Sequence, residues 1–297
     1  MLRAFELHRP ATVAEASSLL AARPDAALYA GGTELLLLMK AGLVRPADVI
    51  DLKRIPDLDA LADGADALAI GATVTHRTLE RSPVVRARWP LVAGVAAHVA
   101  NVRVRNVGTV GGNLAFADPH SDLATLFLVF DATVRLASAA GARELPLGDF
   151  VRGPYETARR PDEVLTDVRL RAWPARTVGA YVKFGLHERP TLGLALALTL
   201  DRDDYVTAAR LAVGCVSPAP HRVEAAERAL VGQPLGALTD EFAGLAADTV
   251  DPVDDLHGGA DYKRELTRVF ARRALTAAVT RAEGRTPDAR YPHAIVV

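Results

Sequence analysis

The sequence predicts a two-domain protein that mixes short strands with helices. Its 297 residues suffice for about two domains at roughly 100–200 residues each. Short apolar runs alternate with helix-like segments in the first half, and longer strand-like runs begin after residue 178. Proline and small residues at positions 173–177 interrupt a strand-like run, so we interpret this segment as the linker between the two domains.

The first half opens with the pattern of a strand, a glycine turn and a helix. Residues 27–30 are short and apolar, and Gly31 and Gly32 end them. Thr33 is a residue type that caps helices, and the leucine-rich residues 34–40 predict a helix that ends near Gly42. Further along, the pattern predicts strands at residues 49–52 and 67–70 and a helical stretch at residues 83–99.

A second glycine-rich segment follows at residues 108–113, where Gly108, Gly111 and Gly112 occur close together. After it we predict a turn at residues 118–122, a helix at residues 123–130 and strands at residues 132–136 and 164–170. Small residues let backbone N–H groups converge on an anion such as a pyrophosphate with no Cβ in the way. The helix that follows Thr33 adds the positive end of its dipole.

An ordinary tight turn explains each glycine segment about as well, because short glycine motifs are weak indicators. Neither segment is a standard nucleotide motif. The sequence has no Gly-Lys-Ser/Thr end of a P-loop, and residues 108–112 lack the spacing of G-x-G-x-x-G.

The second half predicts a smaller domain of three strands followed by helices. The strand candidates are residues 179–184, 192–200 and 210–216, and the helix candidates are residues 223–230 and 262–278. Apolar residues of the last segment recur at helical spacing. We expect the tail after Thr286 to be irregular.

Composition excludes several functional classes. The net charge of −1 lacks the basic excess that phosphate contacts with nucleic acid require. No apolar run is long enough to span a bilayer, and charges in the first ten residues do not fit a signal peptide, so we expect a cytoplasmic protein. A single cysteine, Cys215, excludes a disulfide or an iron–sulfur cluster held by this chain alone. The spacing of the eight histidines predicts no metal site.

Lys183 is a cation within the otherwise apolar residues 181–184. A lysine on the solvated face of a strand is the common arrangement. A charge placed near a cofactor is the alternative, and composition does not decide between the two.

Several motifs in fixed order resemble the FAD-binding subunit of molybdenum hydroxylases. This family comprises the medium subunits of carbon monoxide dehydrogenase-like and xanthine dehydrogenase-like enzymes. The resemblance covers almost the whole chain. Its motifs are AGGTEL at residues 30–35, IGAxxT at 70–75, RNxGTVGGN at 105–113, ADPxSD at 117–122, SPxPxR at 217–222 and DYKREL at 261–266.

The resemblance implies an α+β fold of the vanillyl-alcohol oxidase (PCMH) type. Residues 1–174 would form the FAD-binding domain, in two subdomains at about residues 1–55 and 56–174. Residues 175–281 would form a small α+β C-terminal domain with a three-stranded sheet, as in carbon monoxide dehydrogenase flavoproteins. Residues 282–297 would be a tail.

The resemblance also implies FAD as the cofactor and a set of residues that bind it. Two loops would wrap the pyrophosphate through backbone amides, Asp122 would contact FAD, Leu165 would lie against the flavin, and Lys183 would lie near the isoalloxazine. No catalytic acid or base is implied. The residues of the two loops are Leu28, Tyr29, Ala30, Gly31, Gly32, Thr33, Glu34 and Leu35, and Gly108, Thr109, Val110, Gly111, Gly112 and Asn113.

The function implied is that of an electron-transfer subunit with two partners. A large subunit would carry molybdopterin and a small one two [2Fe–2S] clusters, in a heterotrimer that dimerises. The flavin would pass electrons to an acceptor, for which NAD, a quinone, a cytochrome and oxygen all remain open. A stand-alone FAD oxidase and a flavin-free scaffold or assembly subunit of the same fold are the alternatives.

Overall fold

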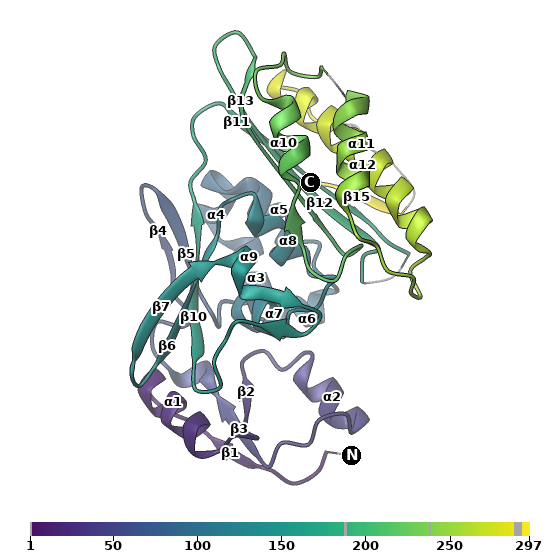
Figure 1. Cartoon of the computed structure of the whole chain (residues 1–297). Helices are drawn as coiled ribbons and strands as arrows, with labels where there is room; N and C mark the ends of the chain where they lie inside the picture. Colours follow the sequence, from purple (N-terminus) through teal and green to yellow (C-terminus); the bar gives the residue numbers. More distant parts are fainter. Residues whose placement is uncertain (1, 187–188, 238, 288–292) are drawn as a thin grey trace.

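The computed structural model describes residues 2–186, 189–237, 239–287 and 293–297. Three bodies follow one another in chain order, from the purple N-terminal body to the green and yellow C-terminal one (Figure 1). Each body has its own sheet, and the larger apolar cores belong to the middle and third bodies. No described helix is both long and apolar enough to cross a membrane.

The first body is a small parallel sheet. Its strand order is β1-β3-β2, and β3 pairs in parallel with both neighbours. Parallel strands need crossover connections, which here contain helices. The bounds are β1 (Glu6–His8), α1 (Val13–Ala22), β2 (Ala27–Tyr29), α2 (Leu35–Ala41), β3 (Asp48–Asp51) and the 3₁₀ turn η1 (Leu52–Arg54).

The middle body is an antiparallel sheet of order β4-β5-β10-β6-β7 with short helices packed beside it. The strands are β4 (Leu61–Asp63), β5 (Ala67–Gly71), β6 (Thr133–Ser138), β7 (Gly141–Pro146) and β10 (Val164–Arg171), with a small hairpin of β8 (Val151–Gly153) and β9 (Glu156–Thr157). The helices are α3 (His76–Arg81), α4 (Pro83–Arg88), α5 (Pro90–Ala96), α6 (Val102–Val107), α7 (Val110–Phe116), α8 (Asp122–Leu128) and α9 (Leu147–Phe150).

The third body is a sheet of order β14-β13-β12-β11-β15 between two layers of helices. Its own helices α10 and α12 contact one face, while α8 and α5 of the middle body contact the other. The elements are β11 (Thr177–Phe184), β12 (Leu192–Leu200), β13 (Val206–Gly214), β14 (His221–Arg222), α10 (Glu224–Leu230), α11 (Thr239–Thr249), α12 (Ala260–Ala282) and β15 (Ala294–Val296).

Strand β12 shows how sequence sets this arrangement. Leu194, Leu196 and Leu198 belong to the core under the helices of the third body. Ala195 and Ala197 alternate with them and belong to the core of the middle body. Both faces are buried, so the strand is apolar throughout, and the small side chains let α8 approach the sheet closely.

The predicted sheet of the C-terminal domain needs correction. It has five strands rather than three, because β14 and β15 pair along its two edges. The tail is likewise not wholly irregular, since β15 lies within it; its residues 288–292 lie outside the described part of the chain. Strands of two or three residues carry too little periodicity to be recognised from a sequence.

Three further predictions fail in detail. The helical stretch at residues 83–99 is two helices, because the Trp89–Pro90 junction ends α4 and begins α5. Thr33 does not cap α2, whose N-cap position is Glu34 with no side-chain cap bond. Residues 110–113, expected in a turn, form the first turn of α7. No predicted helix corresponds to α1, α3, α6, α9 or α11.

The contact between α8 and β13 yields a stability prediction. A Cβ at Gly214 would lie 3.1 Å from Cβ of Thr125 and collide with the Thr125 hydroxyl. We expect Gly214→Ala to lower the free energy of unfolding by about 1–3 kcal/mol through overpacking. Urea unfolding measures the change. Gly244→Ala is the matched control, because Gly244 lies within α11 and no described residue comes within 4 Å of its Cβ position. This variant should be more stable by roughly 0.5–1 kcal/mol. Equal effects of the two variants would contradict the packing argument.

Candidate functional site

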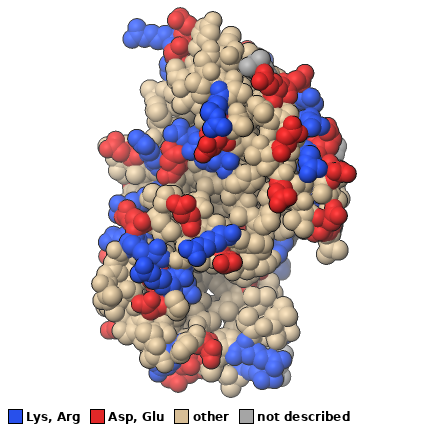
Figure 2. All heavy atoms as spheres, viewed as in Figure 1, with Lys and Arg blue, Asp and Glu red and all other residues tan. Residues whose placement is uncertain are grey.

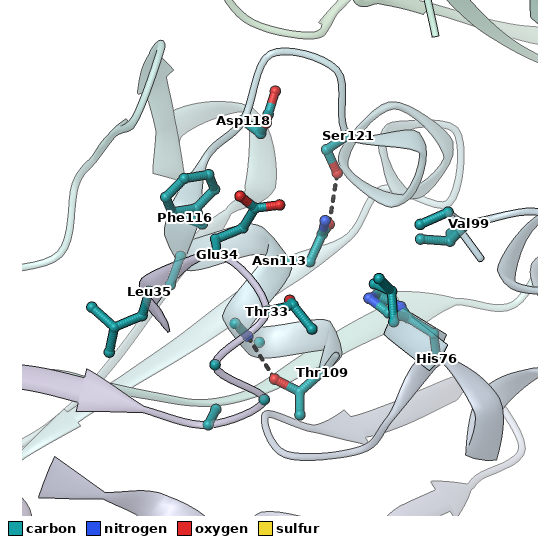
Figure 3. Close-up of a pocket in the computed structure, with 18 of the residues that line it drawn as sticks. Thr33, Glu34, Leu35, His76, Val99, Thr109, Asn113, Phe116, Asp118 and Ser121 are labelled. Carbon is teal, nitrogen blue, oxygen red and sulfur yellow. Dashed lines mark hydrogen bonds between the residues drawn. The ribbon is translucent and has the colours of Figure 1, made fainter. Parts of the chain in front are cut away.

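A cleft of about 350 Å³ lies where the first body meets the middle body. The loop between β2 and α2 forms one wall, and residues of α3, α7 and β10 form others (Figure 3). Arg189 and Pro190 approach it from the third body. Its volume is within the range of small-molecule sites, and glycines and alanines make up much of its lining.

The first glycine loop meets the second glycine segment backbone to backbone. A Cβ at Gly31 would lie 2.8 Å from Cα of Gly108 and collide with the carbonyl of Val107. Gly32 has a φ of +72°, which favours glycine. Among the described residues, nothing accepts a hydrogen bond from the backbone N–H groups of residues 31–34. These donors are therefore available to an anionic ligand.

The second segment contributes differently. The N–H groups of Val110 and Gly111 donate to the carbonyls of Val74 and Ala72 at 2.9 Å, and that of Gly112 donates to Oγ1 of Thr109 at 3.1 Å. These donors already have protein acceptors. Gly111 is also required by packing, because its Cβ would lie 2.6 Å from Cα of Ala72. We therefore expect this segment to offer space and the side chains of Thr109 and Asn113 rather than a second set of free amides.

Most of the residues named from sequence come together in the cleft. Those that line it are Leu28, Ala30, Gly31, Gly32, Thr33, Glu34, Leu35, Thr109, Gly111, Gly112, Asn113, Asp122 and Leu165. Tyr29, Gly108, Val110 and Lys183 do not. Their contact with a cofactor stays a prediction, as it does for the residues in the lining.

The four residues outside the lining have other partners. The Tyr29 ring lies 3.8 Å from Nζ of Lys53. The Gly108 carbonyl accepts from the backbone N–H of His76, and Val110 is fully buried in the core of the middle body.

Lys183 is buried, which excludes the solvated strand face, one of the two arrangements that composition left open. Its Nζ donates to Oδ2 of Asp122 at 2.6 Å and to the carbonyl of His98 at 3.0 Å. The Tyr181 hydroxyl donates to the other oxygen of Asp122 at 2.8 Å. Burial, with the adjacent Asp122 carboxylate, raises the pKa of Tyr181 well above its usual value. Asp122 lines the cleft, and both of its carboxylate oxygens accept hydrogen bonds from residues of the third body.

Arg189 forms ion pairs with two segments that line the cleft. Its guanidinium lies 3.2 Å from Oε2 of Glu34, in the first loop, and 2.8 Å from Oδ2 of Asp118, in the turn after α7. Burial alone would lower the pKa of Arg189, but the carboxylates of Asp118 and Glu34, together with Tyr155, outweigh it and raise the pKa. The two ion pairs hold the loop against the turn.

His76 is a further cleft residue that sequence reasoning missed. It begins α3, its side chain is buried, and its Nδ1 has no hydrogen-bond partner among the residues that the structure describes. Figure 3 shows it beneath Val99, on the side of the cleft away from Glu34 and Leu35. Burial, with a smaller effect of the Arg105 guanidinium, lowers the pKa of His76 to about 4. The imidazole is therefore neutral at pH 7.

Charged cleft residues left little signal in the sequence. Arg159 and Arg189 stand in loops, where no periodicity marks an inward side chain. His76 follows the IGAxxT motif directly and could have been weighed with it.

Elsewhere, ligand atoms of Glu6, His8 and Asp48 lie within 4.8 Å of one another. Asp48 there is bonded to Nε2 of His8 at 2.6 Å and paired with Arg23, and the absence of a metal from this chain stays a prediction.

Comparison with known proteins identifies the class. Residues 3–173 match the family model described as the FAD binding domain in molybdopterin dehydrogenase, and residues 187–278 match the CO dehydrogenase flavoprotein C-terminal domain. The fold and its cleft therefore define an FAD-binding flavoprotein. More particularly, the chain belongs to the FAD-binding medium subunits of molybdenum hydroxylases, the carbon monoxide dehydrogenase and xanthine dehydrogenase family, and is an oxidoreductase subunit.

The similarity extends over whole chains. The carbon monoxide dehydrogenase medium chain of Hydrogenophaga pseudoflava is 35% identical over 93% of this chain and 98% of its own. The xanthine dehydrogenase FAD-binding subunit of Escherichia coli O157:H7 is 29% identical over 94% of this chain and 97% of its own length. The solved carbon monoxide dehydrogenase of H. pseudoflava superposes with a TM-score of 0.90 at 36% identity, over 95% and 99% of the two chains. Quinoline 2-oxidoreductase of Pseudomonas putida 86 also gives 0.90, at 32% identity over 95% and 99%.

The residues of the cleft fit FAD. The backbone N–H groups of residues 31–34, which have no acceptor in the described part of the chain, suit a diphosphate, and a Cβ at Gly31 or Gly32 would disturb the loop that contains them. The apolar side chains of Leu28, Leu52 and Leu165 suit a ring system.

The loop geometry yields a binding prediction. Gly32→Ala should weaken FAD binding by about tenfold or more, because a left-handed φ costs a non-glycine residue roughly 1–2 kcal/mol and the new Cβ would collide with the Tyr29 ring. Fluorescence titration of the flavin-free chain with FAD measures the affinity. Gly42→Ala is the control, since Gly42 also has a positive φ, of 76°, but ends α2 outside the cleft lining. Equal FAD affinity of Gly32→Ala and wild type would refute the assigned role of the loop.

The low pKa of His76 yields a pH prediction. Its folded-state pKa of about 4 lies below the ordinary 6.5 or so, hence the unfolded chain takes up the proton first. The stabilisation is present above about pH 6.5 and is lost as the pH falls toward 4. When the pH falls from 7 to 5, the free energy of unfolding of the flavin-free wild type should decrease by about 2 kcal/mol more than that of His76→Leu. Urea unfolding at the two pH values measures both decreases. Parallel losses in both proteins would contradict a buried neutral imidazole.

Proposed function

We propose that this chain is the electron-transfer subunit of a three-component molybdenum hydroxylase. A large partner would carry molybdopterin and oxidise the substrate, and a small partner would carry the [2Fe–2S] clusters. The FAD of this chain would receive the electrons and pass them to an external acceptor. One observation carries the proposal: the chain and the relatives named as medium chains cover each other almost completely.

Cysteine content supports a separate iron–sulfur partner. A cluster needs several thiolate or imidazole ligands, and the chain has one cysteine. Cys215 is buried at the start of the turn after β13, and burial raises the pKa of its thiol well above the usual value. A buried, protonated thiol is inert.

The described residues support binding and orientation of the flavin. The N–H groups of residues 31–34 would hold the diphosphate, and Asp122 offers an oriented carboxylate because Lys183 and Tyr181 fix both of its oxygens. When bound, FAD exchanges one or two electrons, which suits a link between one-electron clusters and a two-electron acceptor. Since Asp122 compensates the charge of Lys183, we expect the pair rather than an isolated cation to act on the flavin environment.

Both alternatives have less support. A flavin-free scaffold would not need the glycine loop, yet Gly31 and Gly32 and the free donors are present. A stand-alone oxidase would need a substrate domain of its own, whereas the third body is matched over residues 187–278 by the flavoprotein C-terminal domain.

Co-expression with candidate large and small subunits tests the proposal. We expect a yellow complex in which substrate of the large subunit reduces the flavin under anaerobic conditions, followed by its absorbance, while the isolated chain is reduced by dithionite but not by that substrate. A complex built with the Gly32→Ala chain should assemble and lose flavin reduction. Oxidation of the substrate by the isolated chain would favour the oxidase, and a colourless, active complex would favour the scaffold.

A further inference from the structure

Arg159 is a cation held in the wall of the cleft by its own loop. It lies between β9 and β10 and contributes to the cleft lining. Its Nη1 donates to three backbone carbonyls, those of Arg160 and Pro161 at 3.1 Å and that of Glu163 at 2.9 Å. These bonds fix the orientation of the guanidinium before any ligand arrives.

The charge of this guanidinium has no ion-pair partner among the described residues. Burial lowers the pKa of Arg159, and the nearby acidic groups Glu163 and Asp162 only partly oppose that effect. The Glu163 carboxylate is already bonded to Nε of Arg143 and to the backbone N–H of Arg160, each at 2.7 Å. Arg159 is half-buried. A cation that loses part of its hydration with no anion beside it is costly, so such a residue indicates that a ligand supplies the anion.

The other cations at the cleft are compensated. Arg189 forms ion pairs with Glu34 and Asp118. Lys183, which does not line the cleft, forms an ion pair with Asp122. Within the described part of the chain, Nε and Nη2 of Arg159 make no hydrogen bond. They form the planar fork with which arginine binds phosphate oxygens through two parallel bonds.

We propose that Arg159 binds the diphosphate of FAD, together with the backbone N–H groups of residues 31–34. Oxidised FAD is ionised at neutral pH only at its diphosphate, so this group is the anion that a cleft cation can pair with. The inference rests on FAD binding in this cleft, and it is independent of which partner subunits assemble with the chain.

A series of ligands locates the contact. The flavin-free chain is titrated with FAD and riboflavin, followed by flavin fluorescence, and with ADP and adenosine, followed by calorimetry. Arg159→Met should weaken FAD and ADP by about 10–100-fold, the range for a hydrogen bond to a charged group, and leave riboflavin and adenosine within about twofold. Arg159→Lys should recover part of the loss, and the wild-type affinity for FAD should fall more steeply with salt than that of Arg159→Met.

Arg160→Met is the matched control. Arg160 is the next residue and carries the same charge, but its side chain is 69% exposed, and it does not line the cleft. It should bind all four ligands as wild type does.

Each contrary result is distinct. FAD and ADP affinities within twofold of wild type in Arg159→Met would overturn the inference. An equal loss for riboflavin and FAD would overturn it too, because it would place the guanidinium at the flavin ring. If wild type binds neither FAD nor ADP, the site itself is wrong and the inference fails with it.

Discussion

The whole site depends on one close approach of two backbones. Gly31 meets Val107 and Gly108 at a separation that no side chain allows. This approach brings the first body against the middle body at the cleft, where the backbone N–H groups of residues 31–34 have no acceptor among the described residues. The ion pairs of Arg189 with Glu34 and Asp118 then tie the first loop to the turn that follows α7. A flavin dinucleotide bound here would touch both bodies, so its binding would stabilise the contact between them.

The third body supports one wall of the cleft through contacts of β11 and β12 with the middle body. Lys183 and Tyr181 of β11 reach Asp122 of α8, and Ala195 and Ala197 of β12 let the sheet pack against the middle body. A buried ion pair contributes little net stability in itself, because desolvation offsets its attraction. Its value here is positional, since a lining carboxylate with both oxygens bonded has a fixed direction. Figure 2 shows acidic and basic groups interspersed over the visible face, which agrees with the near-zero net charge.

Sequence patterns identified most of the residues that line the cleft, but not the contacts that require those residues. The two glycine segments lie in or beside it, and the long strands β10, β11 and β12 were expected because their apolar runs are long. The reason for Gly111 was not accessible, because it is contact with Ala72, 39 positions earlier in the chain. Strand β15 depends on pairing with β11 more than 100 positions away, and the inward direction of Arg159 depends on carbonyls of its own loop. Local periodicity contains none of this information.

Whether this cleft binds FAD is tested by the absorption spectrum of the purified chain, followed by release of the chromophore, its identification and its ratio to protein. We predict the bands of oxidised flavin and one non-covalently bound FAD per chain. A colourless chain that FAD does not reconstitute would contradict it, because the approach of Gly31 to Gly108 would then build a cleft for some other ligand or for none.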